Sequence, residues 1–244
     1  QLRQGGPLDD VPHGDRRARW GPGVIAVIIP TYGRADRLAR VAANIAENTE
    51  TDHRVVFAVE VDDTASIDVA AELDVDVVVN ERKANYSGAI TTAYLATPAE
   101  HVFAGADDLN FHPGWDVPAL ALMDDWTMVV GTNDLLNPYV TAGLHATHYL
   151  VDRRYLDEVG GVVDQGPGSF LFDGYDHQYP DTEFIGTAKM RARFRPCFDS
   201  VVEHMNAWSP KGEIDATARK TMRAIDADSK LYDSRRDLWF SISR

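Results

Sequence analysis

Cysteine is nearly absent from this sequence, and so are long apolar runs. Cys197 is the single cysteine among 244 residues, which excludes an internal disulfide and a zinc site built from several cysteines. No apolar run approaches the roughly 20 residues that cross a bilayer, so we expect no membrane span. Together the two absences favour a protein that works in the reducing cytoplasm.

Positive charge is also scarce. The chain has 24 lysine and arginine residues against 38 aspartate and glutamate residues, a formal net charge of −14. Proteins that bind nucleic acid over a broad face normally carry a basic stripe, so a nucleic-acid partner is less expected here, although a local basic groove is still compatible. An acidic protein that binds phosphates needs local cations, from a metal ion or from a few Arg and Lys side chains.

The remaining composition is that of an ordinary globular protein, with 44% apolar and 25% charged residues. The length fits one large α/β domain, or such a domain with a C-terminal extension. Residues 1–23 are polar, rich in Gly, Pro and Arg, and lack the apolar core of a signal peptide. We therefore expect a flexible leader over these residues.

Apolar runs alternate with amphipathic stretches in the first half of the chain. Residues 24–29 form a continuous apolar, β-branched run ended by Pro30, which is typical of a strand buried on both faces of a parallel sheet. Similar runs predict strands at 55–59, 75–79 and 101–104, and helical spacing predicts helices over 38–48, 67–73 and about 89–94. This alternation predicts an α/β, Rossmann-like fold with a mostly parallel sheet and flanking helices.

Polar clusters follow four of the predicted strands. These clusters are residues 31–34, 62–63, 82–86 and 107–108. In open α/β sheets, ligands bind outside the carboxyl ends of the strands. We therefore expect the four clusters to meet at one crevice, which is the predicted binding site.

The pattern after about residue 115 is less regular. It predicts helices over 115–123 and 153–159, strands over 127–131, 145–151 and 201–204, a loop over 164–180, a helix opening at about 181, and a late helix through 214–225. Residues 231–244 form a tail that packs either on the domain or on a partner. A homo-oligomer formed through this tail is one expectation.

Asp107 and Asp108 are adjacent carboxylates at the end of a predicted strand. Such a pair is costly unless positive charge lies beside it. A hard divalent cation such as Mg²⁺ or Mn²⁺ takes oxygen ligands and can bridge them to the phosphates of a nucleotide. From these two residues alone, a solvated acidic turn or a helix N-cap explains the pair equally well.

Three motifs, in their order and spacing, resemble the GT-A glycosyltransferases, and specifically their family two. The segment Ile28 to Arg34 resembles the Pro-Thr-Tyr-containing turn after the first strand of that family, and Asp62-Asp63-Thr64 resembles the acidic pair after the second. The segment Asp107 to Trp115 resembles the aspartate-rich metal motif with its trailing Pro-Gly-Trp turn. The resemblance is good from Val24 to Trp115, fair to about His204 and weak afterwards. It implies a single GT-A domain with an irregular C-terminal acceptor region and a nucleoside-diphosphate-sugar donor.

The resemblance also implies roles for residues at the strand ends. Thr31, Tyr32 and Arg34 would line the base and ribose pocket. A hydrogen bond from the base or ribose would be accepted by Asp62 or Asp63, and Arg82 and Asn85 would touch the nucleotide or its phosphates. The alternatives are a solvated helix start for Arg34 and a cap of the next helix for Asp63.

The metal motif departs from the family pattern at one position, because the usual Asp-X-Asp would need a carboxylate where this chain has Ala106. The resemblance then leaves Asp108 as the ligand of Mn²⁺ or Mg²⁺, with Asp107 supporting it or facing the donor sugar. His204 would be a further ligand, unless it is a surface histidine in a loop. Lys211, in the following loop of residues 206–212, would approach the diphosphate.

An acidic segment after the aromatic loop is the expected place of the catalytic base. In inverting members of the family, an acidic residue here deprotonates the acceptor hydroxyl. Asp181 is the first candidate and Glu183 the second, and helix capping with a favourable helix dipole is the alternative for both. His145, His148 and His177 are further candidates to line the acceptor pocket.

The resulting expectation is a hexosyltransferase-type glycosyltransferase, metal-dependent and inverting, that uses a UDP- or GDP-linked sugar and a glycan, protein or small-molecule acceptor. Residues 24–115 would form the nucleotide-sugar-binding half, 116–212 the acceptor and catalytic half, and 213–244 a C-terminal helix and tail. One rival is a nucleotidyltransferase of related fold, but residues 31–37 lack the glycine density of its phosphate loop. A nucleotide-sugar-binding module without catalysis is the other rival, because of Ala106.

Overall fold

Four parallel strands at one end of the sheet occupy the positions that the apolar runs predict. In the computed structural model, which describes residues 20–240, these strands are β1 (Ile25–Thr31), β2 (His53–Val59), β3 (Asp76–Val79) and β4 (His101–Ala104). Strand β1 pairs in parallel with β2 and β4, and β2 pairs in parallel with β3. Most of the predicted leader, and residues 241–244 of the predicted tail, lie outside the described residues.

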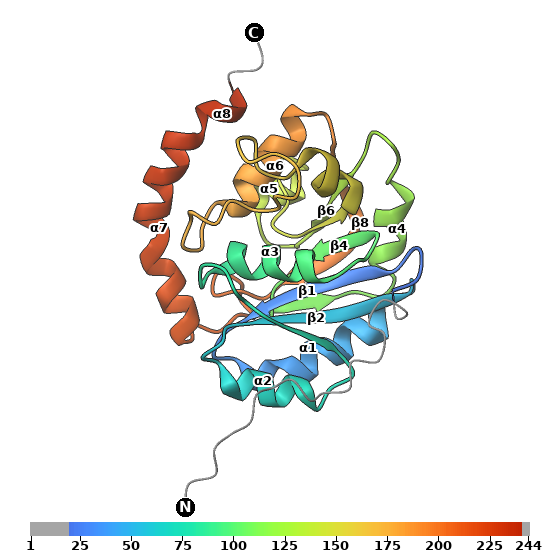
Figure 1. Ribbon diagram of the computed structural model, residues 1–244, viewed down its shortest axis with the longest axis vertical. Coiled ribbons are helices and arrows are strands. Elements are labelled where there is room, and N and C mark those ends of the chain that lie inside the picture. The colour runs from blue at the N-terminus through green and yellow to red at the C-terminus, as the bar shows by residue number, and fades with distance from the viewer. Residues whose placement is uncertain (1–19, 241–244) are drawn as a thin grey trace, which may run out of the picture.

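Three helices connect these strands and cover both faces of the sheet. They are α1 (Ala35–Asn48), α2 (Thr64–Ala71) and α3 (Tyr86–Ala96). Helix α1 buries Leu38, Val41 and Ile45, the spacing of an amphipathic helix. Both α1 and α2 pack on one face of β1 and β2, and α3 packs on the opposite face (Figure 1). The α/β prediction with a mostly parallel sheet is confirmed.

The second half of the chain extends the same sheet. Its strands are β5 (Leu109–Phe111), β6 (Val129–Asn133), β7 (Tyr149–Asp152) and β8 (Phe194–His204), and the strand order is β3-β2-β1-β4-β7-β6-β8-β5. Strand β7 runs antiparallel to β4 and β6, whereas β6 and β8 are parallel. The helices are α4 (Asp116–Ala121), α5 (Pro138–Thr141), a π-helical turn (Tyr155–Val159), α6 (Pro180–Met190), α7 (Ala216–Arg235) and α8 (Asp237–Phe240).

Several boundaries in this half differ from the prediction. Strand β7 begins only at Tyr149, and β8 begins seven residues before the predicted residue 201, since it pairs with β6 before it reaches β5. Strand β5 was not predicted, because its three residues are too few for a periodic pattern. None of the helices in residues 20–240 combines the length and the apolar character needed to cross a membrane.

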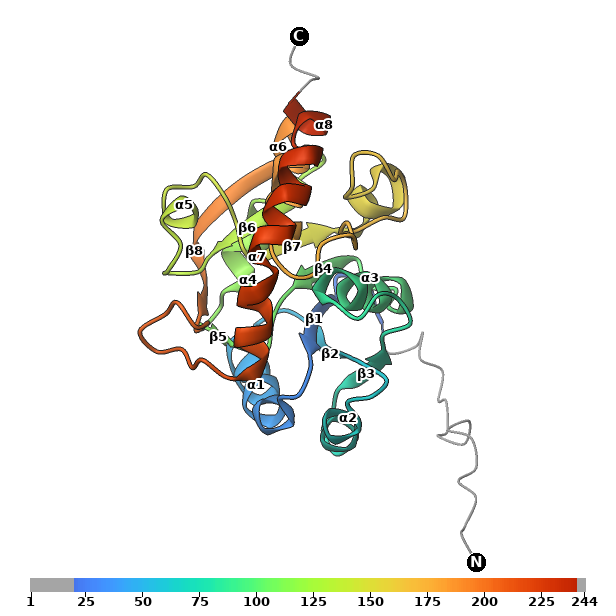
Figure 2. The same cartoon turned by 90° about the vertical axis from the view of Figure 1, so that its left-hand side faces the viewer.

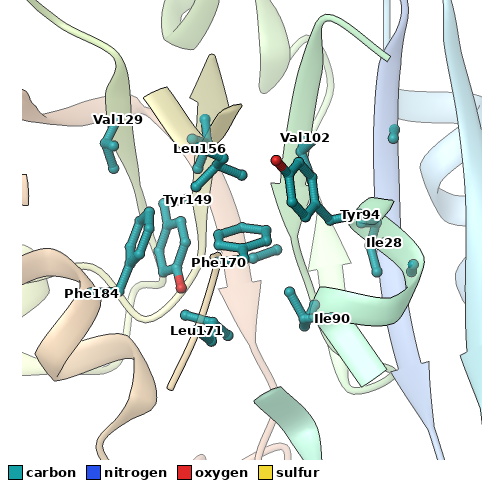
Figure 3. Close-up of a cluster of buried hydrophobic side chains, with 14 of the residues drawn as sticks. Ile28, Ile90, Tyr94, Val102, Val129, Tyr149, Leu156, Phe170, Leu171 and Phe184 are labelled. Atoms are coloured by element: carbon teal, nitrogen blue, oxygen red, sulfur yellow. The ribbon is translucent and has the colours of Figure 1, made fainter. Parts of the chain in front are cut away.

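Aromatic side chains form much of the core between the sheet and α6. Tyr149 stacks on Phe184 with ring centroids 4.6 Å apart, and Phe170 meets both rings edge-on. Figure 3 shows these rings beside Tyr94 of α3. The cluster joins the α3 side of the sheet to α6, which carries Asp181 and Glu183.

Helix α7 runs along one side of the molecule. Figures 1 and 2 show it extending from the α1 end of the sheet to α6. Asp215, the N-cap of α7, contacts Arg34, and Arg235 at its C-terminal end contacts Glu183. The part of the predicted tail formed by residues 231–236 therefore packs on its own domain.

Candidate active site

A glycine places the acidic pair at the end of β4. The Gly105 amide donates to the carbonyl of Ile28 in β1 at 2.9 Å. A Cβ atom at this position would lie 2.7 Å from Ile29 Cδ1 and 3.0 Å from the Ile28 carbonyl oxygen. A side chain at this position would have to displace these atoms. The chain continues alongside β1 and brings the Asp107 carboxylate to Thr31.

Asp107 is buried and held by two partners. Its carboxylate accepts from Thr31 Oγ1 at 2.9 Å and from Arg34 Nη1 at 2.6 Å. Burial raises the pKa of Asp107 to about 6, although the charge of Arg34 opposes this shift. The carboxylate thus links the turn after β1 to the turn after β4, as expected if both belong to one site.

Asp108 faces His204 across the junction of β5 and β8. Antiparallel pairing sets Leu109 opposite His204, and the Met205 amide donates to the Asp108 carbonyl at 2.9 Å. Asp108 Oδ1 lies 3.4 Å from His204 Nε2, and both side chains are largely buried. Burial alone would raise the pKa of Asp108, but His204 and Arg34 lower it well below its usual range.

A second histidine, His148, lies against this pair. Its ring is 4.8 Å from that of His204, and its Nδ1 lies 3.1 Å from the Ala104 carbonyl oxygen. That contact makes Nδ1 the donor and leaves Nε2 as an acceptor, and Nε2 has no hydrogen-bond partner in the described chain. Burial, aided by the charge of His204, lowers the pKa of His148 to about 4, so the ring is neutral at neutral pH.

Asp108 and His204 fit a divalent cation as a two-ligand protein site. A carboxylate oxygen and an imidazole nitrogen suit Mn²⁺ or Mg²⁺, and at 3.4 Å apart both can contact one ion. Among residues 20–240, no group of three or more His, Cys, Asp or Glu side chains is arranged to hold a metal. The other ligands would therefore come from a bound phosphate or from water.

Asp63 and Tyr32 lie at the ends of β2 and β1. Asp63 caps α2 through the Ser66 amide at 3.3 Å, as the alternative interpretation predicts, and its other oxygen accepts from the Gly33 amide at 2.7 Å. Tyr32 is partly exposed and its hydroxyl lies 3.3 Å from Asp62. These contacts gather the predicted nucleotide residues of β1 and β2 at one edge.

Arg34 forms ion pairs with two carboxylates, those of Asp107 and Asp215. Besides Asp107, it contacts Asp215 through Nε at 2.7 Å and Nη2 at 3.1 Å, and Arg37 contacts the same carboxylate at 3.0 Å. Asp215 is 181 residues from Arg34 in the chain. No motif in the sequence predicts this pair, because Asp215 differs from other acidic residues only in its place at the start of a predicted helix.

Arg82 and Asn85 contact the loop that leads to α6. Arg82 pairs with Asp173 at 2.9 Å, and Asn85 Nδ2 donates to the carbonyls of Asp173 at 3.0 Å and Tyr175 at 2.5 Å. Asn85 also caps α3 through the Gly88 amide. Lys211 lies in the loop after β8 and pairs with Glu203 at 2.7 Å. Within residues 20–240, none of these three side chains forms a hydrogen bond or ion pair with Asp107 or Asp108.

The two acidic residues of α6 have different surroundings. Asp181 Oδ2 lies 3.0 Å from His145 Nε2, and the pKa of Asp181 is lowered by His145 against the opposing effect of burial. Both oxygens of Glu183 are occupied: Arg235 contacts them at 2.7 and 2.9 Å, and the Tyr175 hydroxyl donates to one at 2.8 Å. Glu183 is 1% exposed.

Two buried tyrosine hydroxyls belong to α3 and β7. Tyr86 Oη and Tyr149 Oη have no hydrogen-bond partner within the described residues. Burial raises the pKa of Tyr86, and the charges of Asp181 and Asp108 raise it further. Tyr86 belongs to the predicted polar cluster of residues 82–86, whereas Tyr149 lies in an apolar strand pattern, which predicts a core residue and conceals a polar role.

The sheet order, the crossover helices and the acidic strand end define a GT-A fold. Residues 26–200 match the model of glycosyl transferase family 2, and the chain belongs to this family. The resemblance to family two is thereby confirmed, and the chain is a member of a family of nucleotide-sugar glycosyltransferases.

Two solved structures illustrate the fold. A mannosyltransferase from Pyrobaculum calidifontis, in complex with GDP-Man and Mn²⁺, matches with a TM-score of 0.60 and 16% identity, covering 78% of this chain and 59% of that one. Glucosyl-3-phosphoglycerate synthase from Mycobacterium tuberculosis, in complex with Mn²⁺, UDP and glucosyl-3-phosphoglycerate, matches with a TM-score of 0.56 and 15% identity, covering 93% and 86%. These identities show a common fold alone. No curated protein matches the chain.

Proposed function

We propose that the chain transfers a sugar from a UDP- or GDP-linked donor to an acceptor hydroxyl, with help from Mn²⁺ or Mg²⁺. The observation that carries this proposal is the Asp108–His204 pair, 3.4 Å apart beside the anchored Asp107. Two structural relatives, a mannosyltransferase with GDP-Man and Mn²⁺ and a synthase with UDP and Mn²⁺, support both the donor class and the metal.

In this proposal the residues divide between the donor and the acceptor. Asp108 and His204 hold the cation, which when bound neutralises charge on the departing diphosphate. Thr31, Tyr32, Asp62 and Asp63 line the nucleotide pocket. Asp107 and Arg34 form the base of this pocket, because they are buried and paired with each other and so support its other residues.

We assign the catalytic base to Asp181, because Glu183 is fully engaged by Arg235 and Tyr175. Asp181 takes the proton of the acceptor hydroxyl while the acceptor oxygen bonds to the anomeric carbon and the bond to the diphosphate breaks. Attack from the side opposite the leaving group inverts the configuration. His145 holds the Asp181 carboxylate in its ionised form, because their contact lowers its pKa.

Donor binding and turnover test this function. The protein is screened by thermal shift against UDP, GDP and their sugars, with and without Mn²⁺, and then assayed for nucleotide release. A ligand at 100 times its Kd adds about 2.7 kcal/mol of stability, or roughly 5–10 °C for a chain of this size. Asp108→Asn should lose the Mn²⁺-dependent part of the shift and the release of nucleotide, whereas Asp68→Asn, on the exposed side of α2, should keep both. Wild-type release by Asp108→Asn would refute the metal assignment.

A binding module without catalysis is the second candidate. It is favoured by Ala106 and by the two-residue protein ligand set. Calorimetry distinguishes the two, because a module binds nucleotide diphosphate with Mn²⁺ and releases nothing from the sugar donor. The acceptor class (glycan, protein or small molecule), a cytoplasmic location and self-association through residues 231–244 remain predictions from the sequence.

A further inference from the structure

Helix α7 carries a buried carboxylate that binds the loop before α6. Asp228 is 2% exposed. Its two oxygens accept hydrogen bonds from three consecutive backbone amides, those of Asp176 at 2.8 Å, His177 at 2.9 Å and Gln178 at 2.8 Å. Consecutive amides that converge in this way form an anion-binding nest, and here the anion is a side chain of the same molecule.

Tyr179, the next residue of the loop, also contacts α7. Tyr179 has a left-handed backbone, with φ of 73°, a conformation that costs a non-glycine residue about 1–2 kcal/mol. Its ring stacks on Tyr232 of α7, with centroids 4.8 Å apart and planes 24° apart. Such a conformation persists only where its surroundings hold it. Helix α6 starts immediately afterwards at Pro180, with Asp181 in its first turn.

The other side of Asp181 is held by α7 as well. Arg235 contacts both oxygens of Glu183, and also pairs with Asp164 at 2.8 Å. Residues 176–179 precede Asp181 and Glu183 follows it, so α7 holds the chain on both sides of this carboxylate. Helix α7 lies outside residues 26–200, the part of the chain that matches the family.

We propose that Asp228 is a positioning residue for Asp181: by binding the amides of residues 176–178, it fixes the start of α6 and the direction of the base. This inference rests on the proposed function, in which Asp181 accepts the acceptor proton. A carboxylate suits the task because both of its oxygens accept. An asparagine would turn its NH₂ group towards the amides, so Asp228→Asn removes part of the nest with little change in volume.

The test uses the full chain and the donor sugar that gives the largest Mn²⁺-dependent thermal shift, with nucleotide release to water as the rate. Asp228→Asn should slow release on the order of 100-fold, since a shift of about 1 Å in a catalytic group has that effect. Affinity for the nucleotide diphosphate should be unchanged. Hydrogen exchange of amides 176–178 should become at least about tenfold faster. The double variant Asp228→Asn with Asp181→Asn should release nucleotide no more slowly than Asp181→Asn alone, because the carboxylate that Asp228 would position is then absent.

Asp226→Asn is the matched control, since it makes the same charge change on the same helix at an exposed position; its release rate and exchange should be those of the wild type. If Asp228→Asn does not fold, Tyr232→Ala removes the contact with Tyr179 and keeps the buried carboxylate, and should slow release with unchanged donor affinity.

Three results would overturn the assignment: faster exchange at 176–178 with a wild-type release rate, an equal loss in Asp226→Asn, or a double variant slower than Asp181→Asn. A wild-type protein that releases no nucleotide overturns the proposed function itself, which is a different outcome from an active wild type that Asp228→Asn leaves unaffected.

Discussion

The substitution Gly105→Ala tests whether the close approach of Gly105 to β1 places the acidic pair. The added Cβ would lie 2.7 Å from Ile29 Cδ1 and 3.0 Å from the Ile28 carbonyl oxygen. Ile29 is fully buried, so its side chain cannot move without displacing other core atoms. The Ile28 carbonyl is backbone and already accepts from Gly105. Relief must come from the chain after β4, which moves away from β1.

The magnitude follows from packing. Overfilling a tight position costs about 1–3 kcal/mol, and the smaller freedom of alanine in the unfolded chain offsets about 0.4–1 kcal/mol of this. A net loss of about 1–2 kcal/mol lowers the Tm by roughly 2–8 °C in a chain of this length. The same movement carries Asp107 away from Thr31 and Arg34, which contact it at 2.9 and 2.6 Å, so nucleotide binding with Mn²⁺ should weaken.

Thermal unfolding and calorimetry with UDP or GDP and Mn²⁺ measure the two effects. Gly21→Ala is the matched control, because a Cβ there meets no atom within 4 Å, and its Tm and nucleotide affinity should equal those of the wild type. If Gly105→Ala behaves like Gly21→Ala in both measurements, the close approach does not position the site and the reasoning fails.

Two further predictions concern α6. Glu183→Gln leaves Arg235 with Asp164 as its remaining carboxylate, and loss of a buried ion-pair partner costs about 3 kcal/mol. We therefore expect a Tm roughly 6–12 °C lower than that of the wild type, whereas Glu72→Gln, at an exposed position, should leave the Tm unchanged. An unchanged Tm for Glu183→Gln would count against a structural role for Glu183. Asp181 has a lowered pKa in the folded protein, so its contribution to stability is present above the ordinary aspartate pKa of about 4 and is lost as pH falls through the folded value. The Tm difference between wild type and Asp181→Asn should therefore be largest near neutral pH and vanish in strong acid, and a difference that grows on acidification would refute the assigned sign.

The first half of the fold was predictable because most residues of each strand there are apolar and lie together in one run. The predicted strand at 101–104 coincides with β4, and the helix predicted to end at about Asn48 is α1. In the second half, β8 contains Arg195, Pro196 and Asp199, and its partner changes from β6 to β5 along its length. A strand with these polar residues and two successive partners does not show the regular alternation of apolar and polar residues by which a strand is recognised in a sequence.

The site was predictable where motifs follow strands, and not where partners are distant in sequence. The pairing of Asp108 with His204 was expected from the resemblance, and β5–β8 pairing brings these residues together. Asp215 and Asp228 carried no motif, because their partners lie 181 and about 50 residues away. Only the folded chain shows that Asp215 pairs with Arg34 and that Asp228 binds the loop before Asp181, the proposed base.

The charges on the residues at this edge of the sheet explain why a divalent cation suits the Asp108–His204 pair. The basic side chains there are largely committed to carboxylates: the ion pairs are Arg34 with Asp107 and Asp215, Arg82 with Asp173, Lys83 with Asp176, and Lys211 with Glu203. A donor diphosphate brings further negative charge to an already acidic protein, so it must either displace one of these carboxylates or share a metal ion. Displacing Asp107 from Arg34 would leave a buried carboxylate unpaired, which is strongly unfavourable. In the Lys211 pair, 64% of the lysine side chain is accessible although Glu203 is largely buried, and pairs with an exposed partner contribute about 0–1 kcal/mol. Lys211 can therefore turn to a phosphate at small cost, and a cation at Asp108 and His204 would supply the rest of the neutralising charge.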